Sequence, residues 1–235
     1  MIASALVAMP LRAAEVVADT YSWLMSKGDP RVADWPLMQS PLPILSVLAV
    51  YLYFVKVWGP QWMRSRKPFP IERLMIAYNI LMVLLSAWFF VEGGRLTYLP
   101  GGKYNLVCEP VDYSLRPEAM RLATVGWWFL LLKLVELLDT VFFVLRKKES
   151  HISVLHVTHH SLVAWGVWIG LRFGGGGHSA FFPLLNCFIH MLMYSYYCLA
   201  ALGPRVRRFL WWKRYLTILQ MVCQLSCCDS LLALL

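Results

Sequence analysis

The chain has 235 residues, of which 59% are hydrophobic and only 15% are charged, and its mean hydropathy is +0.57. Soluble domains carry about 25% charged residues, so this composition excludes an ordinary soluble protein and indicates an integral membrane protein. The net charge of +9 could suit nucleic-acid binding, but the basic residues gather in loops between apolar segments, so we expect no nucleic-acid partner.

The N-terminal segment, residues 1–41, is expected to lie on the exofacial side of the membrane and to contain an interfacial helix. A secretory signal peptide is the alternative. That alternative needs a basic start and an unbroken apolar run, whereas this segment lacks the first and is interrupted by Pro10 and Arg12.

The remaining residues, 42–235, are expected to form one transmembrane domain. A membrane-spanning helix needs roughly 20 apolar residues, and uninterrupted runs of this length exclude transmembrane strands. We therefore predict an all-α bundle of six transmembrane helices. Their approximate ranges are 42–59, 74–91, 122–145, 152–171, 180–202 and 209–235.

Basic residues follow the first, third and fifth predicted spans, in the segments 61–73, 146–148 and 205–214. These three loops lie on one side of the membrane, so the positive-inside rule makes that side cytosolic and the N-terminus exofacial. A basic cytosolic rim could also attract an anionic substrate. The rim residues expected to bind such a substrate are Lys147, Lys148, Arg208, Lys213 and Arg214.

Ionisable groups interrupt the third span, where "KLVELLDT" contains Lys133, Glu136, Asp139 and Thr140. In a helix, Lys133, Glu136 and Thr140 share one stripe, and Asp139 lies round its side. An ion pair between residues three apart could serve packing alone. Because charges inside a span cost several kcal/mol, a functional role is the competing interpretation.

Three histidines open the fourth span in the stretch "HVTHH", at His156, His159 and His160. They fall within roughly 100° of one helix face. The fifth span contains "NCFIHMLMYSYY", which places Asn186, His190, Tyr194 and Tyr197 on one stripe, together with Met193. A tyrosine-rich stripe can also be helix packing.

The sixth span contains Thr217, Gln220 and Gln224, which could simply join neighbouring helices by hydrogen bonds. However, a rise of 1.5 Å per residue brings the polar clusters of all four spans to the cytosolic half of the bilayer. Four unrelated clusters at one depth are improbable. We therefore expect a shared polar chamber inside the bundle.

Two kinds of enzyme chemistry suit such a chamber. Histidine boxes of the form HxxHH bind iron in desaturases and hydroxylases, but two irons need about eight imidazoles, and this chain has six histidines. The other chemistry uses imidazole directly, as a nucleophile or general base on an acyl group. The histidine count favours acyl chemistry and no bound metal or cofactor.

The motifs KxxExxDT, HxxHH and NxxxHxxMYxYY, in this order and spacing, resemble those of the ELO family, the elongases of very-long-chain fatty acids. The resemblance covers roughly residues 35 to 222 and includes "CEPVDYS" at 108–114 and "LGP...LWWKRYLT" at 202–217. It implies a multi-pass 3-oxoacyl-CoA synthase of the endoplasmic reticulum. Such an enzyme condenses a long acyl-CoA with malonyl-CoA and releases CO2 and CoA.

We assign hypothetical roles within this implied reaction. His159 would take the acyl group, and His156, His160 and His190 would position or exchange protons. Asn186 and Tyr194 would stabilise developing oxyanions. The residues expected to hold the site together are Lys133, Glu136 and Asp139, and those expected to bind substrate inside it are Tyr197, Thr217, Gln220 and Gln224.

Partners consistent with the resemblance are membrane lipid, the two substrates, the reductases and dehydratase of the elongation cycle, and a second elongase chain in a homodimer or heterodimer. The family's sixth span reads TxxQxxQ, but here "TILQMVCQ" places Gln224 one position late. The family also has seven spans and a basic tail, so the chain is expected to be incomplete at its C-terminus. Acting only as a partner subunit is therefore a further alternative.

Overall fold

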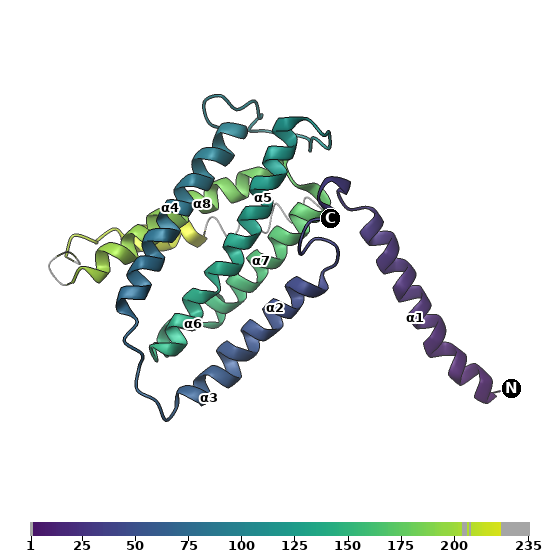
Figure 1. Ribbon diagram of the computed structural model, residues 1–235, viewed down its shortest axis with the longest axis horizontal. Coiled ribbons are helices and arrows are strands. Elements are labelled where there is room, and N and C mark those ends of the chain that lie inside the picture. Colours follow the sequence, from purple (N-terminus) through teal and green to yellow (C-terminus); the bar gives the residue numbers. More distant parts are fainter. Residues whose placement is uncertain (1, 204–205, 207, 222–235) are drawn as a thin grey trace.

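The computed structural model in Figure 1 consists of helices and loops, with no strand in the part that it describes. It describes residues 2–203, 206 and 208–221, with side chains from Arg12 onward except that of residue 13. Most of the helices run side by side as a bundle. The predicted all-α class is confirmed.

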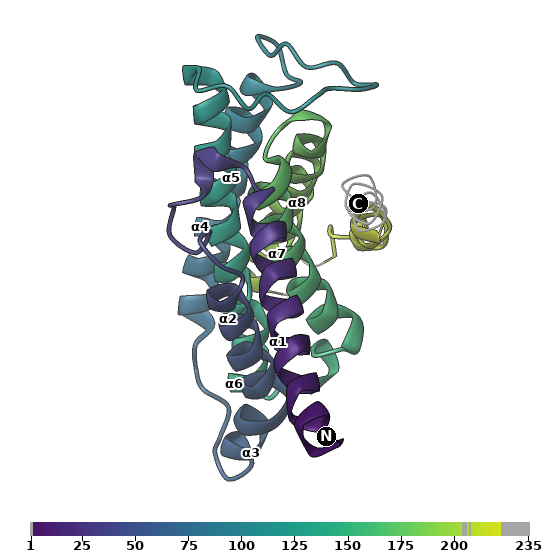
Figure 2. The same cartoon turned by 90° about the vertical axis from the view of Figure 1, so that its right-hand side faces the viewer.

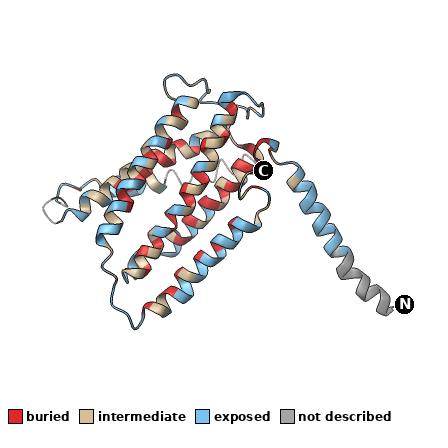
Figure 3. Ribbon diagram, viewed as in Figure 1, coloured by how far each residue is buried: buried red, intermediate tan, exposed pale blue. Residues whose placement is uncertain are grey.

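The first helix, α1 (Ile2–Ser26), projects away from the bundle, and its described side chains are mostly exposed (Figures 1 and 3). The predicted N-terminal helix is therefore present. Its place at a membrane interface stays a prediction. A short 3₁₀ turn, η1 (Pro30–Val32), leads from α1 into the bundle.

The first predicted span is a continuous rod of α2 (Leu42–Tyr53), the π-helical turn η2 (Phe54–Trp58) and α3 (Gly59–Met63). Pro60, at the start of α3, has no N–H to donate, so the regular hydrogen-bond ladder cannot continue through it. Gly59 allows close packing here, because an added Cβ would lie 2.7 Å from the carbonyl oxygen of Phe54 and 2.9 Å from Val144.

Four longer elements complete the bundle: α4 (Glu72–Leu96), α5 with α6 (Pro117–Glu136 and Leu138–Leu145), α7 (Val154–Gly174) and α8 (Phe181–Ala201). The 3₁₀ turns η3 (Glu149–His151) and η4 (Gly177–Ala180) precede α7 and α8. The third span was predicted as one helix over 122–145, but it starts earlier and is broken at Leu137. Residues 213–221 are also helical.

Three helices in the described residues are long and apolar enough to cross a membrane: Leu42–Met63, Glu72–Leu96 and Gly177–Ala201. They support a multi-pass membrane protein. The α5–α6 and α7 helices lie among them (Figure 2) but contain ionisable side chains, which lower their hydropathy. Six spans therefore stay a prediction, and the rest of the sixth predicted span, 222–235, lies outside the described residues.

The central helix of the bundle is α5, which contributes to two apolar clusters. Its Phe129 packs with Met82 of α4 and residues of α8, whereas the adjacent Leu130 packs with Leu48 of α2 and Trp168 of α7. Figure 3 shows the buried positions concentrated on these inward faces. Because both sides of α5 are covered, polar groups on it must find partners within the protein.

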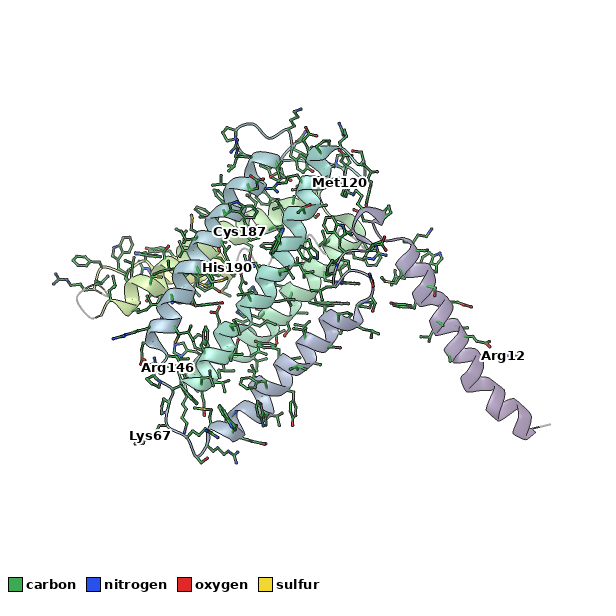
Figure 4. The ribbon with its side chains drawn as sticks, in the orientation of Figure 1. Arg12, Lys67, Met120, Arg146, Cys187 and His190 are labelled. Carbon is green, nitrogen blue, oxygen red and sulfur yellow. The ribbon has the colours of Figure 1, made fainter. Side chains whose placement is uncertain are left out.

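Basic residues gather at one end of the bundle, which we call the basic end. Figure 4 shows Lys67 and Arg146 there and Met120 at the opposite end. Arg146 pairs with Glu72 at 2.6 Å, and the Lys147 ammonium donates to the carbonyl oxygen of Arg64 at 3.3 Å. The loops after the first and third predicted spans therefore lie together, as their charge pattern predicts.

The opposite end, which we call the loop end, is closed by a buried ion pair between Asp29 and Arg31, 2.6 Å apart. Arg31 also donates to the carbonyl oxygens of Asp112 and Gly175, at 2.5 and 3.2 Å. Arg172, near the end of α7, donates to the carbonyl oxygen of Asp29 at 3.0 Å. Three separate segments are thus joined by charge-assisted hydrogen bonds, which are about twice as strong as neutral ones.

Replacing Asp29 by Asn is expected to lower the free energy of unfolding by about 3 kcal/mol, since it leaves Arg31 buried without a countercharge. The measurement is thermal unfolding of the purified chain in detergent. Asp34→Asn is the matched control, because Asp34 is exposed and lies two residues after the end of η1. Equal midpoints for the two variants would show that the ion pair does not hold this end together.

Candidate functional site

A buried ion pair lies at the centre of the bundle. The Lys133 Nζ of α5 is 2.5 Å from Glu136 Oε1, and each side chain is only 2% exposed. Lys133 Nζ also donates to Asn186 Oδ1 of α8 at 2.7 Å. The pair predicted from the sequence is therefore formed, and it joins α5 to α8.

Glu136 is shared with a histidine. His190 Nδ1 of α8 lies 3.0 Å from Glu136 Oε1, so the carboxylate lies between the ammonium group and an imidazole. The Lys133 ammonium group also lies 4.6 Å from the centre of the Phe129 ring. These contacts compensate for removing the charges from water, which costs several kcal/mol per ion.

Asp139, on α6, accepts a hydrogen bond from the Tyr194 hydroxyl at 2.6 Å. The Tyr78 ring of α4 lies edge-on to the Tyr194 ring, with 6.0 Å between centroids. The break at Leu137 separates Asp139 from the stripe of Lys133 and Glu136. Tyr194 is fully buried, so its hydroxyl serves Asp139 and does not face open space.

The three histidines of "HVTHH" form a chain of ring contacts on α7. The centroids of His156 and His160 are 4.5 Å apart, and those of His159 and His160 are 5.5 Å apart. His156 Nε2 lies 2.9 Å from Thr140 Oγ1 of α6. Ser153 caps α7 by accepting a hydrogen bond from the backbone N–H of His156 at 3.1 Å, which fixes the start of the helix.

A cavity of about 230 Å³ opens among α6, α7, α8 and the helical residues 213–221. It brings together most of the predicted site. The predicted residues that line it are Asp139, His156, His159, His160, Asn186, His190, Tyr197, Thr217 and Gln220. Lys133, Glu136 and Tyr194 do not line this polar cavity but support residues that do.

The basic residues predicted to bind substrate do not line the polar cavity. Their side chains are largely engaged at the surface: Arg208 lies 4.7 Å from the Phe209 ring, and Arg214 donates to the Tyr215 hydroxyl at 2.6 Å. Lys148 and Lys213 are exposed, and Lys147 reaches the Arg64 carbonyl oxygen. Gln224 lies outside the described residues.

A second cavity, of about 110 Å³ and mainly apolar, lies toward the loop end between α4, α5, α7 and α8. It shares no lining residue with the polar cavity, but Asn186 lines one and Cys187 the other. Figure 4 shows Cys187 and His190 close together in the middle of the bundle. Six glycines line this apolar cavity: Gly93, Gly126, Gly166, Gly170, Gly175 and Gly176.

Two tyrosines that support the site, Tyr51 of α2 and Tyr78 of α4, are not among the residues predicted from the sequence. The Tyr51 hydroxyl is 2.9 Å from Thr140 Oγ1, and the Tyr78 hydroxyl lies 3.4 Å from the carbonyl oxygen of Val135. A buried tyrosine usually finds a hydrogen-bond partner. A tyrosine within an otherwise apolar span is therefore the signal that could have identified both.

The chain resembles proteins of one kind over most of its length. It is 51% identical over 195 residues to a very long chain fatty acid elongase of Aedes aegypti, which covers 83% of this chain and 54% of that protein. It is 49% identical over 197 residues to very long chain fatty acid elongase 7 of Drosophila melanogaster, covering 84% and 59% of the two chains.

Human very long chain fatty acid elongase 4 is 48% identical over 202 residues, which cover 86% of this chain and 63% of that protein. The chain thus spans between half and two thirds of the length of these relatives. The sequence profile of the GNS1/SUR4 family, ELO, matches residues 36–234. The motifs, the helical bundle and these similarities together show that the chain belongs to the GNS1/SUR4 (ELO) family.

Proposed function

We propose that this chain carries the condensing site of a very-long-chain fatty acid elongase of the endoplasmic reticulum membrane, with its N-terminus lumenal. The reaction joins a long-chain acyl-CoA to malonyl-CoA and yields a 3-oxoacyl-CoA, CO2 and CoA. The observation that carries the proposal is the convergence of four histidines, two amides and a carboxylate on one polar cavity. The names of the relatives agree with it.

His159 is the proposed nucleophile. His156 Nε2 lies 2.9 Å from Thr140 Oγ1, and His190 Nδ1 lies 3.0 Å from Glu136 Oε1, so each has a ring nitrogen beside a polar neighbour. Among the described residues, the His159 ring forms no hydrogen bond; it contacts the His160 ring and lines the cavity. An imidazole with an uncommitted lone pair facing the cavity is suited to attack an acyl group.

The proposed reaction has two steps. A nitrogen of His159 attacks the thioester carbonyl carbon and the C–S bond breaks. The imidazole loses its N–H proton to the departing sulfur, which leaves an acyl-imidazole and CoA as a thiol. Malonyl-CoA then loses CO2, and the electron pair of the broken C–C bond forms an enolate. The enolate carbon attacks the acyl carbon, and the C–N bond to His159 breaks as the new C–C bond forms. The released ring takes up one proton from solvent, which restores the neutral imidazole.

Asn186 is proposed to stabilise the negative charge that develops on the reacting oxygens. It lines the polar cavity, and its hydrogen bond from Lys133 fixes its orientation. The sequence pattern predicts the same role for Tyr194, but its hydroxyl donates to Asp139. This contact favours Tyr194 as a supporting residue for Asp139.

The two cavities suggest how a substrate is held. The acyl tail is proposed to pass the level of Asn186 and Cys187 and to enter the apolar cavity. There it would contact apolar side chains in place of membrane lipid. The CoA phosphates would remain at the basic end, near Lys147 and Lys148. No cofactor is needed for this chemistry.

The alternatives are weaker. The relatives are elongases, which disfavours the interpretation of "HVTHH" as an iron-binding box of a desaturase. A role only as a partner subunit is distinguished by one assay, malonyl-CoA-dependent release of CO2 by the isolated chain.

His159→Ala is expected to lower the condensation rate by at least about 100-fold, the usual contribution of a reacting histidine. The covalent step is measured by intact mass spectrometry after exposure to acyl-CoA alone. The unsubstituted chain should gain the mass of one acyl group, and His159→Ala should not.

His151→Ala is the control for this test, since His151 is exposed and does not line the polar cavity. It should keep both the acyl adduct and the condensation rate. An unmodified chain under turnover conditions, with activity retained in His159→Ala, would contradict the covalent mechanism.

Gly170→Leu is expected to shorten the longest acyl chain that the site extends. Gly170 lines the apolar cavity, and an added Cβ has no atom within 4 Å, so the leucine side chain can fill space proposed for the tail. The measurement is the product profile from radiolabelled malonyl-CoA and a panel of acyl-CoAs. Ile169→Leu, which changes shape outside this cavity, should leave the profile unchanged; an unaltered profile for Gly170→Leu would place the tail elsewhere.

A further inference from the structure

Three helices are joined by a short series of hydrogen bonds that ends at the polar cavity. The Tyr51 hydroxyl of α2 lies 2.9 Å from Thr140 Oγ1 of α6, and the same Oγ1 lies 2.9 Å from His156 Nε2 of α7. Tyr51 is 5% exposed and Thr140 is fully buried. His156 lines the cavity.

The direction of these hydrogen bonds follows from the number of protons. A buried phenol needs an acceptor, and within the described part of the chain the only hydrogen-bond contact of the Tyr51 hydroxyl is with Thr140. Thr140 Oγ1 therefore accepts from Tyr51. Its own single proton also needs an acceptor, and within the described residues the remaining hydrogen-bond contact of Thr140 Oγ1 is His156 Nε2. The tautomer that satisfies both hydroxyl protons therefore leaves His156 Nε2 unprotonated.

This arrangement assigns a tautomer to His156. With Nε2 as an acceptor, the neutral imidazole carries its proton on Nδ1. This tautomer is assigned from the hydrogen-bond network, as histidine tautomers ordinarily are. It matters to the cavity because the His156 ring packs on His160, which in turn packs on His159.

We propose that Tyr51 is a positioning residue which, through Thr140, holds His156 in its Nδ1-protonated tautomer and fixes the orientation of the histidine rings that face the polar cavity. Tyr51 does not line that cavity. The effect on catalysis rests on the proposed function, whereas the tautomer does not depend on it.

Tyr51→Phe tests the proposal because it keeps the ring that packs in the apolar cluster and removes only the hydroxyl. We expect kcat to fall by roughly tenfold, by analogy with the smallest losses seen when a metal-binding histidine loses the group that orients it, with the KM for acyl-CoA unchanged. Tyr53→Phe on the same helix is the matched control, since Tyr53 is 60% exposed. It should have no effect.

Two Thr140 variants separate positioning from packing. Thr140→Val removes the hydroxyl at nearly constant shape and should match the loss in Tyr51→Phe, and the double variant should be no slower, because both residues act through one connection. Thr140→Ser keeps the hydroxyl and should retain the rate. Thermal unfolding midpoints in detergent confirm that the variants compared are folded.

The tautomer is measured directly by NMR of the full chain in detergent with 15N-labelled histidine, the His156 signals being assigned by their loss in His156→Gln. An unprotonated Nε2 in the unsubstituted chain, and a mixture of tautomers in Tyr51→Phe, is the expected result. A protonated Nε2, an unchanged kcat in Tyr51→Phe, or additive losses in the double variant would each overturn the proposal. A chain that fails to condense substrates but shows the expected tautomers would overturn the proposed function and leave the positioning role of Tyr51 standing.

Discussion

The ion pair of Lys133 and Glu136 is the constraint on which the rest of the structure depends. A charge inside an apolar bundle is tolerated only with a partner and further hydrogen bonds, and both partners here are 2% exposed. Asn186 and His190 complete the set from α8. The relative position of α5 and α8 is thereby fixed, and with it the wall of the polar cavity.

The two cavities divide the interior by chemistry. The polar cavity, lined by histidines, lies beside α6 and α7, whereas the apolar cavity, lined by six glycines, lies toward the loop end. Between them, Lys133 lies over the Phe129 ring, and Phe129 lines the apolar cavity. The proposed substrate, which has a charged head, a reactive thioester and a long hydrocarbon tail, matches this order of environments.

The loop end contributes stability at a distance from the proposed chemistry. Arg31 and Arg172 bind backbone carbonyl oxygens of segments far apart in the chain. Trp168 adds a hydrogen bond to the carbonyl oxygen of Leu37, at 2.8 Å. These contacts hold α7 against the segment before α2. They steady the helix that carries the histidines without placing any charge in the cavities.

The sequence by itself determined the all-α class, the pairing of Lys133 with Glu136 and the faces that carry His156 and Asn186, because helical periodicity and the cost of buried charge act locally. It did not predict the break at Leu137, the apolar cavity or the roles of Tyr51 and Tyr78. Only the tertiary structure decided these, since a tyrosine or a glycine in an apolar helix acquires its function from whichever neighbouring helix packs against it.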